Sequence, residues 1–304
     1  MIVTVTPAPA IDWTAHVKDF ALGAVNRIDS STREPNGKGL NVSWALHRAE
    51  VPTVAVFPGG GETAGFMARK LSEADLEHVL VPTALDVRTN LTLVTEGEPT
   101  KLNEPGVPLT EEQSTALVDA ALEAGARAQA ILLCGSHPAG FTGEHVSRLI
   151  EGPHAAGVEC VVDTSGAALE HVIPLRPDLI KPNVHELAEL SGRDLRTMAD
   201  VVAAARETCA DGTKAVLASL GPDGAVYVSA DRVVLAQARD VPFINSVGAG
   251  DALLAGFMSH DGDAADRLAS AVLWASSAVA CPTTLFPVRD ELRERITVTE
   301  WDGA

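Results

Sequence analysis

Short apolar runs alternate with amphipathic stretches along most of the chain. The apolar runs predict buried strands, and the stretches between them predict helices. One helix is indicated by apolar residues at positions 42, 45, 46 and 49, and another by a capping box that Thr110 and Gln113 would form. The predicted strands include residues 54–57, 130–134, 159–162, 178–180 and 215–218.

Strands that alternate with helices predict a mostly parallel central sheet with helices on both faces, an α/β fold. Residues 12–35 and 87–104 break this rhythm, because they alternate like strands without an intervening helix. They predict a small antiparallel sheet that projects as a lid. The chain shows no repeat and no linker, so we expect one domain over residues 1–304 with an inserted lid. Ligands of such sheets bind at the carboxyl ends of the strands.

Composition narrows the possible partners. The 304 residues are 46% hydrophobic and 21% charged, as in a folded globular protein, and the net charge of −18 argues against nucleic-acid binding. It allows a phosphorylated ligand, because a few local cations and backbone N–H groups suffice for one. Four cysteines without a CxxC pair predict reduced thiols. The N-terminus does not resemble a signal peptide and no apolar run would span a membrane, so we expect a cytoplasmic protein.

The sharpest motif is VGAGD at residues 247–251, directly before an apolar helical stretch. Small residues at a helix start (Gly248, Ala249 and Gly250) leave backbone N–H groups accessible, which suits charge on a transferring phosphoryl group. The carboxylate of Asp251 in the first turn can accept a proton from a substrate hydroxyl. A loop with an acidic helix cap explains these five residues equally well.

A second glycine-rich segment, NGKGLNV at residues 36–42, also precedes a helix. Gly37 and Gly39 permit close approach of the backbone to a ligand, Lys38 supplies a positive charge, and the amide of Asn41 can donate to and accept from sugar hydroxyls. A simple turn that caps a helix is the alternative interpretation.

These two segments resemble the GAGD signature of the ribokinase-like (PfkB) kinases and the GGKGxN motif of their phosphosugar branch. That branch includes 1-phosphofructokinases and tagatose-6-phosphate kinases. The resemblance runs in the correct order over roughly residues 4 to 258. Its other motifs are PAID at 9–12, GAVNR at 23–27, RTN at 88–90 with NEPG at 103–106, GSHPAG at 135–140, DTSG at 163–166, KPNVHE at 181–186 and SLGPDG at 219–224.

The resemblance implies ATP and Mg²⁺ as cofactors and assigns roles to the matching residues. Asp251 would be the catalytic base, and residues 248–250 would stabilise the transferring phosphoryl group. The sugar phosphate would be bound by Asp12, Arg27, Gly37, Lys38, Gly39, Asn41, Arg88 and Ser136. The nucleotide would be bound by Lys181, Asn183, Ser219, Gly221 and Gly224. Glu186, through water, and Asn183 would hold the metal, although a plain helix start also explains this pair.

Four positions depart from the family pattern: Ala8, Asn36, His137 and Ser246. The first three lie around the expected sugar pocket, so the phosphotransfer chemistry is predicted more firmly than the sugar. We expect phosphorylation of D-fructose 1-phosphate to fructose 1,6-bisphosphate. Tagatose-6-phosphate kinase and 6-phosphofructokinase are the alternatives, and a catalytically idle sugar-phosphate sensor is the alternative from another class.

Other functions fit less well. A kinase for a free sugar would not need both Lys38 and Arg88, and a nucleoside kinase should carry more aromatic residues than 4%. GGGETA at residues 59–64 fits a loose dinucleotide pattern but lacks the acidic residue about 20 positions on. The sequence contains no HExxH pair, the motif that would indicate a zinc site. The apolar lid face around Leu91 and Leu93 predicts a homodimer formed through the lid.

Overall fold

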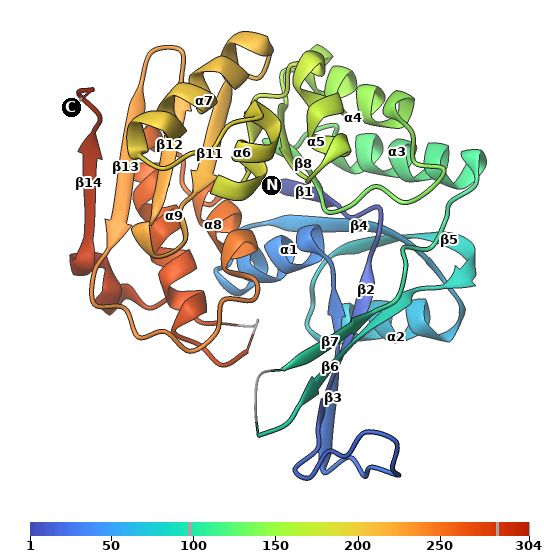
Figure 1. The fold of residues 1–304 in the computed structure, drawn as a ribbon. Coiled ribbons are helices and arrows are strands. Elements are labelled where there is room, and N and C mark those ends of the chain that lie inside the picture. Colours follow the sequence, from blue (N-terminus) through green and yellow to red (C-terminus); the bar gives the residue numbers. More distant parts are fainter. Residues whose placement is uncertain (97–98, 284–285, 304) are drawn as a thin grey trace.

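The computed structural model describes residues 1–96, 99–283 and 286–303, which form two sheets and the helices around them (Figure 1). The larger sheet has ten strands. In spatial order they are β14 (Ile296–Glu300), β13 (Val233–Ala238), β12 (Ala225–Ser229), β11 (Ala215–Ser219), β10 (Leu179–Ile180), β9 (Glu159–Asp163), β8 (Ala130–Cys134), β1 (Ile2–Val5), β4 (Thr53–Gly60) and β5 (His78–Asp86).

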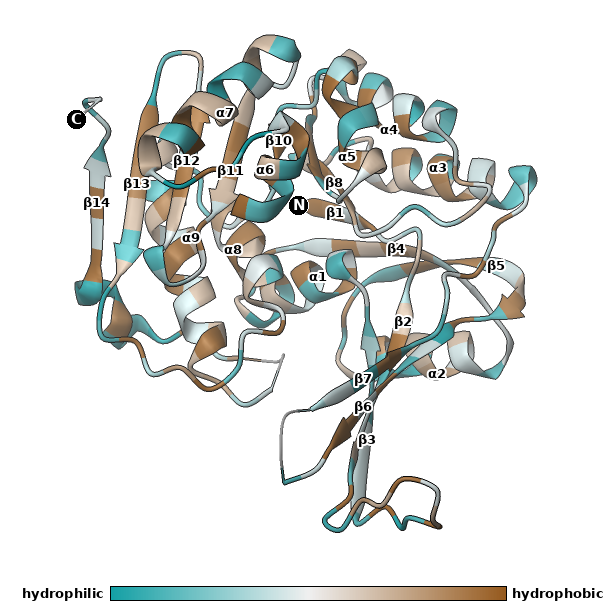
Figure 2. Cartoon of the chain, in the orientation of Figure 1, coloured by the Kyte–Doolittle hydropathy of each residue, from teal (hydrophilic) through white to brown (hydrophobic). Residues whose placement is uncertain are grey.

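Seven neighbouring strands of this sheet are parallel: β5, β4, β1, β8, β9, β10 and β11. Strands β12, β13 and β14 continue the sheet antiparallel at one edge. Strand β1 lies inside the sheet, where Val3 pairs with Val54 of β4 and Ile131 of β8. Figure 2 shows strongly apolar residues along β8 and along β11 to β13, as expected for strands covered on both faces. The predicted fold class is confirmed, and the run 130–134 coincides with β8.

Helices cover both faces of this sheet. Side chains of α3 to α7 pack into one core cluster, and those of α1, α8 and α9 pack into a second cluster on the opposite face. The helices are α1 (Lys38–Arg48), α2 (Gly61–Glu73), α3 (Glu111–Gly125), α4 (Gly143–Ala155), α5 (Ala167–Val172), α6 (Val184–Ser191), α7 (Met198–Asp211), α8 (Ala249–Met258) and α9 (Ala264–Val279), with short 3₁₀ turns at Ile173–Leu175, Gly221–Asp223 and Asp290–Arg295.

Both predicted helices are present. The helical pattern at positions 42–49 belongs to α1. At the start of α3, Gln113 N donates to Thr110 Oγ1 at 3.2 Å and Thr110 N donates to Gln113 Oε1 at 2.9 Å, so the predicted capping box is confirmed. Within residues 1–96, 99–283 and 286–303, no helix is long and apolar enough to cross a membrane.

The two segments predicted as a lid form the second sheet, which projects from the main body in Figure 1. Its outer pairs are antiparallel as expected, but its central pair, β2 with β6, is parallel. Both strands begin at the carboxyl end of a parallel main-sheet strand, β1 and β5, and therefore enter the lid in the same direction. Residues 97 and 98 of the predicted segment lie outside the described residues. The lid strands, in order, are β3 (Ser30–Asn36), β2 (Ala10–His16), β6 (Arg88–Val94) and β7 (Thr100–Asn103).

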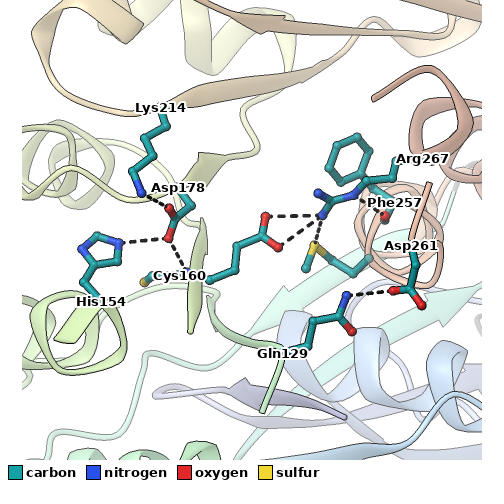
Figure 3. A network of polar contacts seen from close by, with 10 residues as sticks. Gln129, His154, Cys160, Asp178, Lys214, Phe257, Asp261 and Arg267 are labelled. Atoms are coloured by element: carbon teal, nitrogen blue, oxygen red, sulfur yellow. Dashed lines mark hydrogen bonds and ion pairs between the residues drawn. The ribbon is translucent and has the colours of Figure 1, made fainter. Parts of the chain in front are cut away.

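Helix α8 is anchored at its carboxyl end by Arg267 of α9 (Figure 3). The guanidinium lies 4.2 Å from the centre of the Phe257 ring, and its Nε donates to the Phe257 carbonyl at 3.1 Å. Arg267 Nη2 also pairs with Glu159 at the start of β9 at 3.3 Å. These contacts tie α8 to the amino ends of the parallel strands, so its own amino end is held at the opposite, carboxyl edge.

Candidate active site

The amino end of α8 carries the predicted catalytic motif. Gly248 has a φ of +79°, in the left-handed region that glycine adopts without strain, and α8 begins one residue later. Asp251 then lies in the first turn, with only 8% of its surface exposed. The Ala249 N–H donates to the Ser246 carbonyl at 3.3 Å and is therefore already engaged. We predicted instead that the N–H groups of all three small residues would face a phosphoryl group.

Asp251 is held by a side chain from the distant glycine-rich segment at residues 36–42, which is the predicted sugar loop. Asn41 Nδ2 of α1 donates to Asp251 Oδ2 at 2.7 Å. Burial, and after it the negative charge of Asp163, raises the pKa of Asp251 to about 6. The Asn41 hydrogen bond and the nearby lysines, Lys38 and Lys181, act in the opposite direction. A buried carboxylate with a pKa near neutrality suits a general base.

Asp163 at the carboxyl end of β9 brings two predicted lysines together. Its carboxylate is fully buried and lies 2.8 Å from Lys38 Nζ and 3.3 Å from Lys181 Nζ. Burial tends to lower the pKa of Lys38, but the charge and hydrogen bond of Asp163 outweigh it and raise that pKa above its usual range. A Cβ atom on Gly250 would lie 3.5 Å from Lys181 Nζ, so these charges adjoin the α8 start.

The lid supplies the second part of the site. Asp12 on β2 accepts a hydrogen bond from Asn90 Nδ2 of β6 at 3.1 Å on one oxygen and from Asn36 Nδ2 on the other. Burial raises the pKa of Asp12, although both amides act to lower it. Asn41 Nδ2 lies 3.4 Å from Asn36 Oδ1, which connects this lid carboxylate to the surroundings of Asp251.

The glycines of the sugar loop are required by close packing. Gly37 has a φ of +142°, and a Cβ there would lie 2.6 Å from Thr6. A Cβ on Gly39 would lie 2.5 Å from Thr6 Oγ1. A Cβ atom is not tolerated at less than 3.0 Å from another heavy atom, so only glycine lets the start of α1 lie directly against Thr6. The backbone of Lys38 and Asn41 is thereby fixed.

Of the other predicted sugar-site residues, Arg88 and Ser136 adjoin the site and Arg27 does not. Arg88 contacts the carbonyls of Ala8 and Glu104 at 3.5 Å each, while its Nε is buried without a hydrogen-bond partner. Ser136 is exposed next to Gly135, where a Cβ would lie 4.0 Å from Lys38 Cβ.

Arg27 is exposed in the loop between β2 and β3, at the end of the lid away from α1 (Figure 1). The three cations that the resemblance assigns to the sugar phosphate are Arg27, Lys38 and Arg88, which predicts that they lie together around its phosphate group. Within one chain the structure does not gather them, because Lys38 is paired beside Asp251 and Arg27 lies beyond the lid strands.

A pocket of about 750 Å³ also borders the start of α8. It joins three predicted nucleotide residues, Ser219, Gly221 and Gly224, to Ala249 and Gly250 of the catalytic motif. Sequence reasoning missed its apolar wall, because that wall combines a loop with parts of two helices, α8 and α9, and no local motif marks it. The wall is formed by Val241, Phe243, Leu253, Val272, Ala275 and Val279.

The pair predicted to hold a metal forms a helix cap. Asn183 Oδ1 accepts from the N–H groups of His185 and Glu186 at 2.8 and 2.9 Å, and Glu186 Oε2 accepts from Asn183 N at 2.8 Å. The oxygen of Asn183 is therefore engaged, whereas Glu186 Oε1 has no such bond to this cap. Among the described residues, no three histidine, cysteine, aspartate or glutamate side chains group closely enough to hold a metal by themselves.

Comparison with known proteins agrees with this arrangement. Residues 2–294 match the family model described as pfkB family carbohydrate kinase. A 1-phosphofructokinase from Haloferax volcanii is 35% identical over 306 residues, which cover 99% of this chain and 98% of the relative. A 1-phosphofructokinase from Bacillus subtilis is 33% identical over 261 residues, 85% of each chain. Phosphofructokinase-2 from Escherichia coli, solved with fructose-6-phosphate, superposes with a TM-score of 0.86, 28% identity and 97% coverage of both chains.

The chain belongs to the pfkB family of carbohydrate kinases. The predicted family and the predicted enzyme class, an ATP-dependent sugar-phosphate kinase, are both confirmed.

Proposed function

We propose that this kinase phosphorylates D-fructose 1-phosphate to fructose 1,6-bisphosphate. The observation that carries the proposal is the position of Asp251, between the 750 Å³ pocket and the hydrogen-bonded group around Asp12. A base in that position can serve a sugar on one side and a nucleotide on the other. The particular sugar is supported by the relatives named 1-phosphofructokinase, one of which aligns almost from end to end.

Asp251 would take the proton from the sugar hydroxyl. Its Oδ2 accepts from Asn41, which leaves Oδ1 for the substrate. With a pKa of about 6, the carboxylate is mostly ionised at neutral pH yet remains basic enough to accept a proton. The paired cations Lys38 and Lys181 would then stabilise charge on the phosphoryl group, and Gly248 and Gly250 would contribute backbone N–H groups.

Arg88 would bind the phosphate that the sugar already carries. Its two hydrogen bonds to backbone carbonyls are long, at 3.5 Å, and its buried Nε has no partner among the residues that the structure describes. A guanidinium with unused donors can form a bidentate, charge-assisted contact with phosphate oxygens. Of the three cations predicted to bind the sugar phosphate, Arg88 alone supports the proposal that the sugar already carries a phosphate.

Mg²⁺ would be held mainly by the ATP phosphates and by water. The residues present fit such an ion, because Glu186 keeps one carboxylate oxygen outside its helix cap and the charge of Glu186 acts on Lys38. Asn183 does not fit as a direct ligand. An ion that retains several waters needs only one or two protein carboxylates. We expect Glu186→Ala to raise the Mg²⁺ concentration needed for half-maximal rate, and an unchanged Mg²⁺ dependence would exclude Glu186 from this role.

A homodimer through the lid is part of the proposal. Register places Trp13, Leu91 and Leu102 in one row on one face of the lid, and Leu102 is 58% exposed. A small projecting sheet with an exposed apolar face is protected by pairing. Light scattering at micromolar concentration tests the dimer, and a strictly monomeric mass would contradict it. The cytoplasmic location and the single domain over residues 1–304 remain predictions.

The test of the proposed substrate is kcat/KM for three sugar phosphates measured side by side with a coupled assay. We expect fructose 1-phosphate to be best by at least several-fold over tagatose 6-phosphate and fructose 6-phosphate. Fructose 6-phosphate is the second candidate, because the structurally similar Escherichia coli phosphofructokinase-2 was solved with it. Preference for either competitor would refute the specific sugar, and no turnover of any would favour a sugar-phosphate sensor.

A further inference from the structure

A continuous series of hydrogen bonds connects the lid to the catalytic helix. Asn90 on β6 donates to Asp12 on β2, and Asn36 at the end of β3 donates to the other oxygen of Asp12. Asn36 Oδ1 then lies 3.4 Å from Asn41 Nδ2 on α1, which donates to Asp251 at 2.7 Å. Five elements from different parts of the chain, β6, β2, β3, α1 and α8, thus share one network, and Asn36 is the member through which the lid joins it.

The strand register explains how Asn36 reaches Asp12. Asp12 lies directly opposite Glu34 on β3 and opposite Asn90 on β6, and Asn36 is two residues beyond Glu34. Residues two apart on a strand share a face, so Asn36 is the diagonal neighbour of Asp12. Its other amide atom, Oδ1, accepts from the N–H of Gly37, which fixes the amide plane and turns Nδ2 toward the carboxylate.

The amide donor is well matched to its surroundings. Burial raises the pKa of Asp12, and burial together with the charge of Asp12 raises the pKa of the facing Glu34. Two amide donors stabilise the ionised form of Asp12 without adding a charge, while Lys101 and Arg88 act on it from further away. A carboxylate offers about four acceptor positions, so two remain for sugar hydroxyls once Asn36 and Asn90 are bound.

We propose that Asn36 is a positioning residue for the sugar: it orients the Asp12 carboxylate toward the substrate hydroxyls and links the lid to Asn41. The inference rests on the proposed function. The motif that this loop resembles has glycine in this place, and glycine has no side chain to perform either task. The departure from the family pattern therefore tightens the sugar site and leaves the nucleotide side unchanged.

Two substitutions test whether the amide donor of Asn36 is required, or only the presence of a side chain at position 36. Asn36→Gly removes the hydrogen bonds of the side chain to Asp12, Asn41 and the Gly37 N–H. We expect the KM for the sugar phosphate to rise roughly 5- to 20-fold. The KM for ATP should not change, and kcat should change much less than the sugar KM. Asn36→Asp keeps the size and the acceptor for Gly37 but places a second carboxylate beside Asp12, so its sugar KM should rise more than that of Asn36→Gly.

Thr32→Gly is the matched control. It introduces the same glycine into β3, at an exposed position opposite Thr14 and outside the hydrogen-bonded network. All measurements use whichever sugar phosphate the wild-type enzyme prefers, so a wrong sugar does not compromise this test. If Asn36→Asp keeps a wild-type sugar KM, the side chain only fills the turn and the inference is overturned. A sugar KM unchanged in both variants overturns it as well.

Hydrogen exchange of the substrate-free protein gives a readout that does not depend on turnover. Amides of β2 and β6 should exchange faster in Asn36→Gly than in Thr32→Gly, because only the first substitution releases the lid from α1. Equal exchange in the two variants would contradict the link between lid and helix, even if the sugar assignment held. A wild-type protein without activity, combined with slower exchange in Thr32→Gly than in Asn36→Gly, would instead reject the proposed function and leave the link between lid and helix intact.

Discussion

The proposed nucleotide half and the proposed sugar half of this site are built in different ways. The nucleotide half is a pocket of about 750 Å³ with apolar walls from α8 and α9, completed by loop glycines on the main sheet. The sugar half consists of side-chain hydrogen bonds on a four-stranded lid, centred on Asp12. One half therefore depends on shape and packing, and the other on the directions of individual donors and acceptors.

The departures from the family pattern occur in both halves, since Ser246 lines the pocket whereas Ala8 and Asn36 lie on the proposed sugar side. Asn36 donates to Asp12 through its side chain, whereas the buried Ala8 accepts from Arg88 through its backbone carbonyl. His137 belongs to neither half directly. Its ring packs edge-on against Phe141 at 5.4 Å, and burial lowers its pKa to about 4, so it is neutral at physiological pH.

The largest effect is expected where the two halves meet. Asp251→Asn should lower kcat by roughly 10²- to 10⁴-fold while both KM values stay nearly unchanged, because the base acts in the transition state. Steady-state kinetics with both substrates varied provides the check. A variant that retains a tenth of the wild-type kcat would show that Asp251 is not the base.

Arg88→Ala should affect the sugar half alone. Loss of a charge-assisted phosphate contact is expected to reduce kcat/KM for the sugar phosphate roughly 10- to 100-fold. The KM for ATP should remain at its wild-type value. A proportional loss for both substrates would mean that Arg88 supports the lid as a whole and does not bind the phosphate.

Phe243→Ala is the counterpart on the nucleotide half. Phe243 lines the pocket and is 74% exposed, so its removal should not disturb a core. We expect the KM for ATP to rise about 3- to 10-fold, since a purine base loses apolar contact there. The sugar KM should not move. If it does, the two halves are coupled more tightly than their construction suggests.

The smallest effect concerns pH. Asp251 must be ionised to accept a proton, so kcat/KM should fall as the pH drops through about 6. The negative charge of Asp163 raises that pKa, and Asp163→Asn should move the acid limb to lower pH by up to about one unit. A limb that stays in place or moves upward would contradict this electrostatic account.

Local patterns predicted the parallel core well and the site less completely. Strand β8 and the α3 cap depend on neighbouring residues only, and both were predicted in full. The parallel pairing of β2 with β6 depends on how two distant connections leave the main sheet, which no local pattern contains. Asp163 appeared in the sequence only within the DTSG motif, because Lys38 lies 125 positions away along the chain and Lys181 belongs to a separate motif.

The hydrogen bond between Asn41 and Asp251 joins residues 210 positions apart. During synthesis, the sugar loop and both lid segments leave the ribosome well before α8 exists, and amino-terminal parts of a chain fold first. Asp251 therefore arrives after both of these parts and docks on α1, against which α8 packs. A truncated chain that ends before residue 248 would retain the lid and the sugar loop but lack the base, so unfinished copies should not consume ATP.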